Sequence, residues 1–200
     1  DCIIDNYFHK SKKIKLLNLS LDLIDSYNLQ NILASYIVCK YFKIPIKYFN
    51  ESIKNFKGLP YRSLTIHNSK SKLIINNSKA TNISSSLSTL ENKKNIHLIL
   101  GGIAKEDGFS KFNKFRNNID QIYIYGKSRF KIKNQINLSK ISIIKKNLQE
   151  VINKLWNDIS DKNHKVTILF APACASFDQF ENFEKRGAYF NQLILNKLKK

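Results

Sequence analysis

The sequence VTILFAPACASFDQFENFEKRG, residues 166–187, decides which fold the rest of the chain can adopt. Val166–Phe170 is a short apolar run rich in residues that favour a buried β-strand. The small residues 171–176 then predict a tight turn. Asp178 and Glu181 have the spacing of a capping box, which indicates that a helix begins there. The phenylalanines that follow recur at helical spacing, at Phe177, Phe180, Phe183 and Phe190.

A strand, a tight turn and a helix in this order are typical of an open α/β sheet. In such sheets ligands bind at the loops after the carboxyl ends of the strands. The free N–H groups at the start of a helix favour an anion at that position. On spacing alone, the simpler interpretation is a buried strand and an amphipathic helix without any ligand.

The composition allows a packed core but gives the chain a strongly basic charge. The 200 residues are 42% hydrophobic, and 34 Lys and Arg stand against 15 Asp and Glu, a formal net charge of +19. Almost all of the basic residues are lysines scattered among Asn and Ile, and the arginines are confined to positions 62, 116, 129 and 186. Because nucleic-acid recognition favours the planar guanidinium, a compositional bias explains the charge better than a nucleic-acid-binding surface. A basic nucleic-acid-binding domain remains the alternative from another functional class.

The sequence indicates a cytoplasmic protein. Cys2, Cys39 and Cys174 are far apart and form no CxxC pair, so neither a disulfide framework nor a zinc site is predicted. No apolar run is long enough to span a membrane, and residues 1–15 do not resemble a signal peptide. The chain contains no Met, which we interpret as a sign that it is a piece of a longer protein.

The segment Gly58–Pro60 marks a predicted boundary between two parts. Before it we expect short strands at 2–4 and 14–19 and helices at 27–42 and 46–56. After it we expect a hairpin of strands at 63–67 and 72–76, further strands at 96–100, 121–125, 141–144 and 166–170, and helices at 82–90, 110–116 and 148–159. This alternation predicts an α/β fold, a mostly parallel sheet with helices on both faces.

Turns with similar chemistry follow the strands that end near residues 76, 100 and 170. The first supplies Lys79 and Thr81, the second supplies a Gly-Gly turn and Lys105, and the third supplies Ser176 at the expected helix start. If the strands are parallel, these turns meet at one edge of the sheet. Together they suit an anionic ligand with carboxylates or phosphates. Taken singly, each turn is weak evidence, because a lone lysine is usually solvated and Thr81 or Asn82 would usually be only a helix cap.

The catalytic motifs of a complete nucleotide-using enzyme are missing. The sequence has no GxxxxGK[ST] loop for phosphates and no cluster of Asp, Glu and His for Mg²⁺. Cys174 has no evident His partner, so we interpret it as a packing residue in the turn. We therefore expect this chain to be inactive on its own.

The motifs at these turns resemble those of the Mur ligase family, in particular of the members that add D-glutamate. The resemblance rests on APACASFDQFENFEKRG at 171–187, NNSKATN at 76–82 and GGIAKEDGF at 101–109, with FKGLPYR at 56–62 and YNLQNILAS at 27–35 in the expected order. It implies a Rossmann-like C-terminal domain at 59–200 that binds D-glutamate. It also implies that residues 1–58 are the end of a central ATP-binding domain.

The resemblance further implies an ATP-dependent amide ligase of peptidoglycan precursor synthesis, which contributes to cell-wall formation, cell shape and cell division. ATP phosphorylates the carboxylate of UDP-MurNAc-L-alanine, and the amine of D-glutamate attacks the acyl phosphate. The Mg²⁺ ligands and the phosphate loop are expected in a part that this sequence lacks. The enzyme is expected to be a monomer that binds neither nucleic acid nor membranes. A sibling ligase acting on folate or on a later peptide intermediate is the alternative within the family.

Individual roles follow from the resemblance, motif by motif. Lys79 is expected close to the transferred phosphoryl group. The D-glutamate contacts are expected from Thr81, Lys105, Ser176, Phe177 and Phe183, and the ATP contacts from Asn31, Arg62 and Asn77. The chain departs from the family at Asn77, where an Asp is common, so a contact to the ribose would lose a charge but keep a hydrogen bond.

Overall fold

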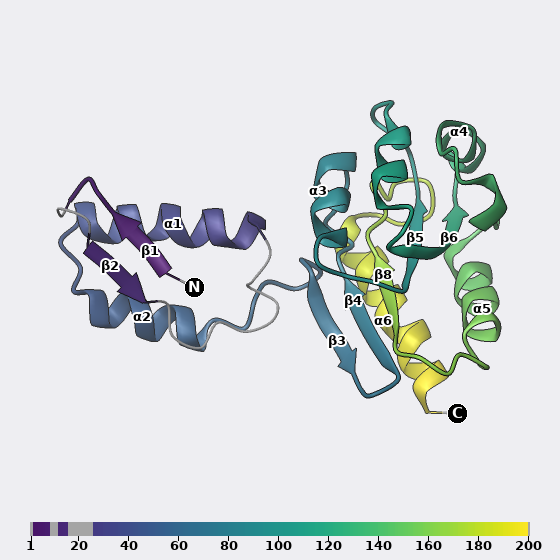
Figure 1. Cartoon of the computed structure of the whole chain (residues 1–200). Coiled ribbons are helices and arrows are strands. Elements are labelled where there is room, and N and C mark those ends of the chain that lie inside the picture. Colours follow the sequence, from purple (N-terminus) through teal and green to yellow (C-terminus); the bar gives the residue numbers. More distant parts are fainter. Residues whose placement is uncertain (1, 9–11, 16–25, 200) are drawn as a thin grey trace. The chain divides into compact units, whose positions relative to one another are not determined.

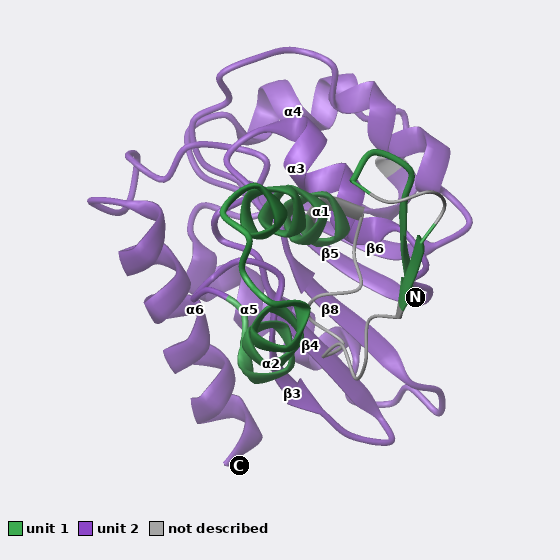
Figure 2. Ribbon diagram, turned by 90° about the vertical axis from the view of Figure 1, so that its left-hand side faces the viewer, with its two compact units in different colours: residues 1–58 green, residues 59–200 purple. Residues whose placement is uncertain are grey.

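The computed structural model describes residues 2–8, 12–15 and 26–199, and the chain divides into two units at Gly58 (Figure 2). Unit 1 comprises residues 1–58 and unit 2 comprises residues 59–200. The division falls within the Gly58–Pro60 segment, where Gly58 has a φ of +79°. Each unit has an apolar core of its own.

Unit 1 is a small α+β unit. The strands β1 (Cys2–Asp5) and β2 (Lys12–Lys15) pair antiparallel, and the helices α1 (Ser26–Tyr41) and α2 (Ile46–Asn55) follow (Figure 1). The core consists of Ile3, Ile14, Ile32, Tyr36 and Phe49. The strand expected at 14–19 begins earlier, at Lys12, and residues 16–19 lie outside the described residues.

A buried hydrogen bond joins β1 to α1 in unit 1. The Tyr36 hydroxyl donates to Asp5 Oδ2 at 2.5 Å, and the other carboxylate oxygen of Asp5 accepts the N–H groups of Tyr7 and Phe8. Burial and the neighbouring carboxylate raise the pKa of Tyr36 well above its ordinary value. The hydroxyl therefore stays protonated, and Asp5 fixes both the helix and the chain after β1.

Unit 2 is organised around a six-stranded sheet with the order β3-β4-β8-β5-β6-β7. Its strands are β3 (Leu64–Asn68), β4 (Lys72–Asn76), β5 (Ile96–Gly101), β6 (Ile119–Tyr125), β7 (Ser142–Ile144) and β8 (Val166–Phe170). Only the edge strand β3 runs antiparallel to its neighbour, whereas the other pairings are parallel. The predicted hairpin and the mostly parallel sheet are both confirmed.

Helices cover both faces of this sheet because neighbouring strand residues point to opposite sides. Ile75 and Leu169 belong to one apolar layer, and Ile74 and Phe170 belong to the other. The first layer is completed by α3 (Ile83–Leu87), the 3₁₀ helices η2 (Ser88–Leu90) and η3 (Phe109–Phe115), and α4 (Arg129–Gln135). The second is completed by α5 (Leu148–Asp158) and α6 (Phe183–Leu198).

Two helical segments between β6 and β7 were not predicted, α4 and the short 3₁₀ helix η4 (Ser139–Ile141). In α4 only Ile132 is buried, and most of its other residues are polar or basic. A helix with so few apolar positions leaves no periodic pattern in the sequence. The helix expected at 110–116 forms as the 3₁₀ helix η3.

The predicted start of the last helix at Asp178 is wrong. α6 begins at Phe183, because Asn182 adopts an extended backbone conformation and its side chain accepts the N–H of Lys185 at 2.7 Å. The carboxylate of Asp178 instead accepts the N–H of Lys127 at 2.8 Å, from the loop after β6. Ser176 therefore does not lie at a helix N-terminus but within a loop that runs from Ala171 to Asn182.

The observed cap gives a direct test of where α6 begins. The substitution Asn182→Ala removes the acceptor for the Lys185 N–H and should lower the free energy of unfolding of unit 2 by about 1 kcal/mol. Urea titration followed by the fluorescence of Trp156, the single Trp of the chain, measures this change. Gln192→Ala, at an exposed position of the same helix, is the matched control. Equal stability of the two variants would contradict the observed cap.

Candidate functional site

The loops after β4, β5 and β8 meet at the carboxyl edge of the sheet, joined by backbone hydrogen bonds. We call them the β4 loop (residues 77–82), the β5 loop (102–108) and the β8 loop (171–182). Ile103 and Ala175 exchange a pair of N–H···O bonds of 2.9 Å, which joins the β5 and β8 loops. The Gly101 N–H donates to Pro172 O at 3.0 Å, and the Asn77 N–H donates to Phe170 O at 2.7 Å.

The side chain of Arg186, from α6, lies beneath these loops and is fully buried. Its Nε donates to Ser78 Oγ at 3.0 Å, and Nη2 donates to the carbonyl of Ser78 at 2.8 Å. Nη1 donates to the carbonyl of Cys174 at 2.9 Å and to that of Gly101 at 3.5 Å. One guanidinium therefore contacts the β4 loop, the β8 loop and the last residue of β5, from which the β5 loop begins.

The loop after β6, residues 126–128, adds a further layer of hydrogen bonds. The Ser128 N–H donates to Gly102 O at 3.0 Å, and Ser128 Oγ accepts the N–H of Ala104 at 2.9 Å. Asp178 fixes the β8 loop to the same segment through the N–H of Lys127. The β5 loop, which carries Lys105, is thus hydrogen-bonded both to the β8 loop and to the loop after β6.

Glycines are required at 101 and 102 because the backbone of neighbouring segments approaches these two residues closely. Gly101 and Gly102 have φ values of +150° and +127°, which residues with a Cβ rarely adopt. A Cβ on Gly101 would collide with the carbonyl of Tyr125, and a Cβ on Gly102 would collide with that of Ala175. The pair therefore lets the β5 loop lie directly against its neighbours.

The predicted D-glutamate contacts from the loops differ in exposure. Ser176 is only 2% exposed, and its hydroxyl forms no hydrogen bond with any described residue. Thr81 is half-buried and Lys105 is exposed, and their side chains likewise have no hydrogen-bond or ion-pair partner in the described part of the chain. The Ser176 oxygen is not among the buried polar atoms without a partner in the described residues, so it keeps some access to solvent and is available to a ligand.

Lys79 and Phe183 lie together, whereas Phe177 points away from the core. The Lys79 ammonium lies 4.3 Å from the centroid of the Phe183 ring, a cation–π contact between the β4 loop and the start of α6. The Ser78 hydroxyl donates to the Phe183 carbonyl at 2.8 Å and fixes this arrangement. Phe177 is 68% exposed next to Ser176, which is unusual for a large apolar side chain.

The residues predicted to contact ATP are spread over both units. Asn77 is buried at the start of the β4 loop, and Arg62 is exposed just before β3. The carbonyl of Tyr61 accepts the N–H of Lys79 at 2.9 Å, which places the segment containing Arg62 beside the β4 loop. Asn31 is exposed on α1 in unit 1.

Sequence reasoning missed the buried polar residues behind the loops, above all Arg186 and Ser78. Tyr125 is fully buried with an unpartnered hydroxyl, and Oδ1 of Asp178 is also buried without a hydrogen-bond partner among the described residues. Burial raises the pKa of Tyr125 beyond its ordinary value. A signal for Arg186 was present in the sequence, since a charged residue precedes Gly187 on the apolar side of an amphipathic helix.

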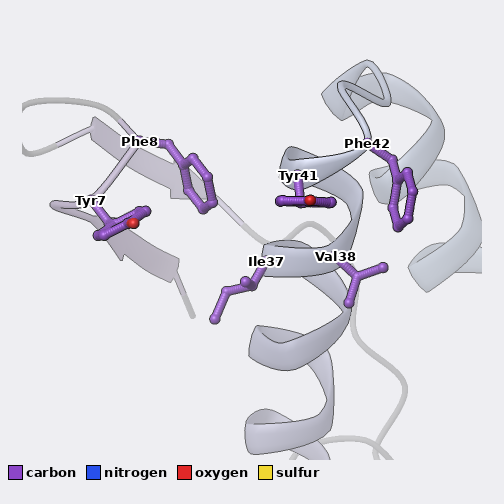
Figure 3. A pocket seen from close by; sticks show the side chains of 6 residues that line it. All are labelled: Tyr7, Phe8, Ile37, Val38, Tyr41 and Phe42. Atoms are coloured by element: carbon purple, nitrogen blue, oxygen red, sulfur yellow. The ribbon is translucent and has the colours of Figure 1, made fainter.

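A separate groove of about 690 Å³ lies in unit 1 and differs chemically from the loop site (Figure 3). Its lining is aromatic and aliphatic, with Tyr7, Phe8, Ile37, Val38, Tyr41 and Phe42. Such a surface offers no cation to a carboxylate. Among the described residues no group of three or more His, Cys, Asp or Glu could hold a metal ion, and none of the described helices is long and apolar enough to cross a membrane.

Comparison with known proteins agrees with this fold and these motifs. The ligase named UDP-N-acetylmuramoylalanine–D-glutamate ligase from Rickettsia prowazekii is 35% identical over 192 residues, covering 96% of this chain and 43% of that protein. The ligase of the same name from Rickettsia bellii is 36% identical over 196 residues, with coverage of 96% and 43%. No protein-family model matches the chain.

Solved structures show the same fold at low sequence identity. The UDP-N-acetylmuramate–alanine ligase of Thermotoga maritima aligns with a TM-score of 0.63 and 13% identity, covering 90% of this chain and 40% of that one. The relatives above, with the loop motifs that the chain shares with them, show that the chain belongs to the Mur ligase family. Within the family, the relatives that match it at 35% and 36% identity are named as ligases for D-glutamate. The chain spans about 43% of the length of the curated relatives that it matches.

The burial of Cys174 predicts how the thiols of the chain react. Burial raises the pKa of the Cys174 thiol to about 12, so at pH 8 only about one molecule in ten thousand carries the thiolate there. Iodoacetamide should therefore alkylate exposed Cys2 in the folded protein and leave Cys174 unmodified, as mass spectrometry of peptides would show. In urea both should react. Alkylation of Cys174 in the folded state at the rate of Cys2 would contradict the observed packing.

Proposed function

We propose that this chain is the D-glutamate-binding part of an ATP-dependent amide ligase that extends UDP-MurNAc-L-alanine in peptidoglycan precursor synthesis. The observation that carries the proposal is the meeting of the β4, β5 and β8 loops, which gathers Lys79, Lys105 and the unpaired Ser176 hydroxyl at one edge of the sheet. The names of the related ligases give the same amino acid. Residues 59–200 would bind D-glutamate, and residues 1–58 would belong to the ATP-binding domain.

D-Glutamate carries two carboxylates and one amine, and this site offers groups that match the carboxylates. Lys105 is an exposed cation without a partner in the described residues, so its ammonium is free to pair with a carboxylate. The hydroxyls of Ser176 and Thr81 would donate further hydrogen bonds, and the rings of Phe177 and Phe183 would flank the carbon chain. These roles leave the amine unpaired and directed towards the acyl phosphate.

The chemical step forms an amide bond. The neutral amine nitrogen of D-glutamate attacks the carbonyl carbon of the acyl phosphate, the C–N bond forms, and the phosphate leaves with the electron pair of the broken C–O bond. The nitrogen gives up one proton, which the departing phosphate or water accepts. The acyl phosphate itself forms when the carboxylate of UDP-MurNAc-L-alanine takes the γ-phosphoryl group of ATP and ADP leaves. Lys79, already held over the Phe183 ring, would neutralise charge on the phosphoryl group.

ATP and Mg²⁺ belong to the proposed reaction, but this chain supplies only part of their site. Asn31, Arg62 and Asn77 are the residues that we propose as contacts of the nucleotide. Because the described residues contain no cluster of metal-binding side chains, no Mg²⁺ ligand is assigned to them. We infer a cytoplasmic, monomeric enzyme, as the resemblance to the Mur ligases implies.

The arrangement of arginines does not favour the nucleic-acid alternative. Arg186 is buried beneath the loops, and Arg129 donates to the carbonyl of Gly126 at 3.0 Å. Only Arg62 and Arg116 remain exposed among the arginines, and they lie on different elements. We therefore expect only the weak, strongly salt-dependent affinity for nucleic acid that any lysine-rich surface has.

The test of the proposed function is a hybrid enzyme. The part of the Rickettsia prowazekii ligase that this chain does not match is fused before Asp1, and ADP release is measured with ATP, Mg²⁺ and UDP-MurNAc-L-alanine. We expect release to depend on D-glutamate and not on L-glutamate, and the 200-residue chain alone to be inactive. A folded hybrid that accepts another amino acid in place of D-glutamate would overturn the assignment.

In this hybrid, Lys105→Ala should raise the KM for D-glutamate by at least about tenfold and leave the KM for ATP nearly unchanged. The reason is that one carboxylate loses a charged hydrogen-bond partner. Lys94→Ala removes an exposed lysine before the amino end of β5, and this control should behave like the unmodified hybrid. An unchanged KM for D-glutamate in Lys105→Ala would exclude the proposed role.

Ser176→Ala should have a smaller effect than Lys105→Ala. It removes one neutral hydrogen bond, of about 1 kcal/mol, which corresponds to a rise of about fivefold in the KM for D-glutamate. Because the Ser176 hydroxyl has no partner within the described residues, the variant should be as stable as the unmodified protein. A loss of stability with an unchanged KM would mean that the hydroxyl has a structural role instead.

A further inference from the structure

The buried guanidinium of Arg186 is not explained by packing alone. It is a charged group with no exposed surface, and no carboxylate of the described residues lies within ion-pair distance of it. Burying an unpaired charge is costly unless hydrogen bonds compensate for it. Here the compensation comes from the carbonyls of Ser78, Cys174 and Gly101.

These acceptors lie in, or at the start of, the loops that carry the predicted ligand-binding residues. Ser78 immediately precedes Lys79 in the β4 loop, and Cys174 lies two residues before Ser176 in the β8 loop. Gly101 is the last residue of β5 and leads into the loop that carries Lys105. The buried Arg186 side chain thus contacts backbone next to Lys79, close to Ser176, and at the strand end that leads into the loop carrying Lys105.

The surrounding packing leaves little freedom for this arrangement. Gly187, next to Arg186, lies so close to the Tyr61 ring and Ser78 that a Cβ would collide with the ring. The Asn76 side chain donates to the carbonyl of Gly187 at 2.9 Å and to Asn191 Oδ1 at 2.7 Å, which fixes α6 against the end of β4. The guanidinium therefore has a defined position relative to the loops.

We propose that Arg186 is the positioning residue of the D-glutamate site, holding the β4, β5 and β8 loops at the spacing at which Lys79, Lys105 and Ser176 contact one ligand. This inference rests on the proposed function, because the ligand is the one assigned there. Arg186 does not touch the ligand. It acts on the loops through the backbone carbonyls to which its planar guanidinium donates hydrogen bonds at the same time.

A lysine cannot reproduce the hydrogen bonds of the guanidinium, and Arg186→Lys is therefore an informative variant. Lysine keeps the charge and much of the volume, but its single ammonium cannot bond Ser78 and Cys174 in the same geometry. We expect the 200-residue variant to fold and to bind D-glutamate about tenfold more weakly than the unmodified chain. A merely structural role would lower the unfolding midpoint and leave the affinity of the folded protein unchanged.

The experiment is a D-glutamate titration of the ¹⁵N-labelled chain, followed by the backbone amide signals. Without ligand, Arg186→Lys should shift the signals of Gly102, Ile103 and Ala175, and leave those of Val151 and Leu155 in α5 in place. Arg116→Lys, at an exposed position after η3, is the matched control and should change neither the loop signals nor the affinity. L-Glutamate serves as the ligand control.

The outcomes separate this inference from the proposed function. If the unmodified chain and the hybrid enzyme both fail to respond to D-glutamate, the proposed function fails, and with it the ligand part of the inference. If the unmodified chain responds and Arg186→Lys responds with the same affinity, only the role of Arg186 is overturned. Unshifted loop signals in Arg186→Lys overturn that role whatever the ligand does.

Should Arg186→Lys fail to fold, Ser78→Ala provides the second variant. It removes the acceptor for Arg186 Nε together with the hydrogen bond that the Ser78 hydroxyl donates to the Phe183 carbonyl, but leaves the bonds from Arg186 to the backbone carbonyls. We expect it to shift the same loop signals and to weaken D-glutamate binding by about threefold. If its loop signals and its affinity both equal those of the unmodified chain, the inference is wrong.

Discussion

A single buried charge organises the carboxyl edge of the sheet. The Arg186 guanidinium is removed from water, so its N–H groups must find acceptors within the protein, and the acceptors are backbone oxygens of chain segments far apart in sequence together with one hydroxyl. Such a group tolerates little displacement of its partners, because each lost acceptor would leave a desolvated donor. The loops around it are consequently fixed more firmly than exposed loops usually are.

The parallel sheet is what brings these segments to the same place. β4, β8 and β5 are adjacent and run in the same direction, so the loops that follow them share one edge. The backbone pairing of Ile103 with Ala175 then continues the contact beyond the end of the strands. Two glycines without side chains at 101 and 102 make this pairing possible, because any Cβ there would meet a carbonyl.

Local patterns in the sequence were sufficient to predict the strands of the sheet, but they were not sufficient to predict the structure of the loops. Strands such as β8 are predominantly apolar because both faces are covered, and this is visible without a structure. The start of α6 was misplaced because Asp178 and Asn182 are both good caps, and the choice depends on Lys127, a residue distant in sequence. The sequence shows a charged residue at 186 on the apolar side of the helix, but its burial was not predicted, since burial of a charge depends on acceptors from other loops. The meeting of the three turns followed from strand direction alone, whereas the ligand contacts of Lys105 and Ser176 stay predictions.

The segment between Gly58 and β3 connects the linker between the two units to the backbone of Lys79. Tyr61 and Ser63 are held at φ values of +61° and +51°, which cost energy for residues with side chains. The Tyr61 ring packs against Gly187, and its carbonyl bonds the N–H of Lys79. A rotation at Gly58 would therefore leave this end of the linker attached to unit 2. A rotation at Tyr61, by contrast, would pull directly on the backbone of Lys79, so torsion in the linker and the position of that ammonium are coupled through one hydrogen bond.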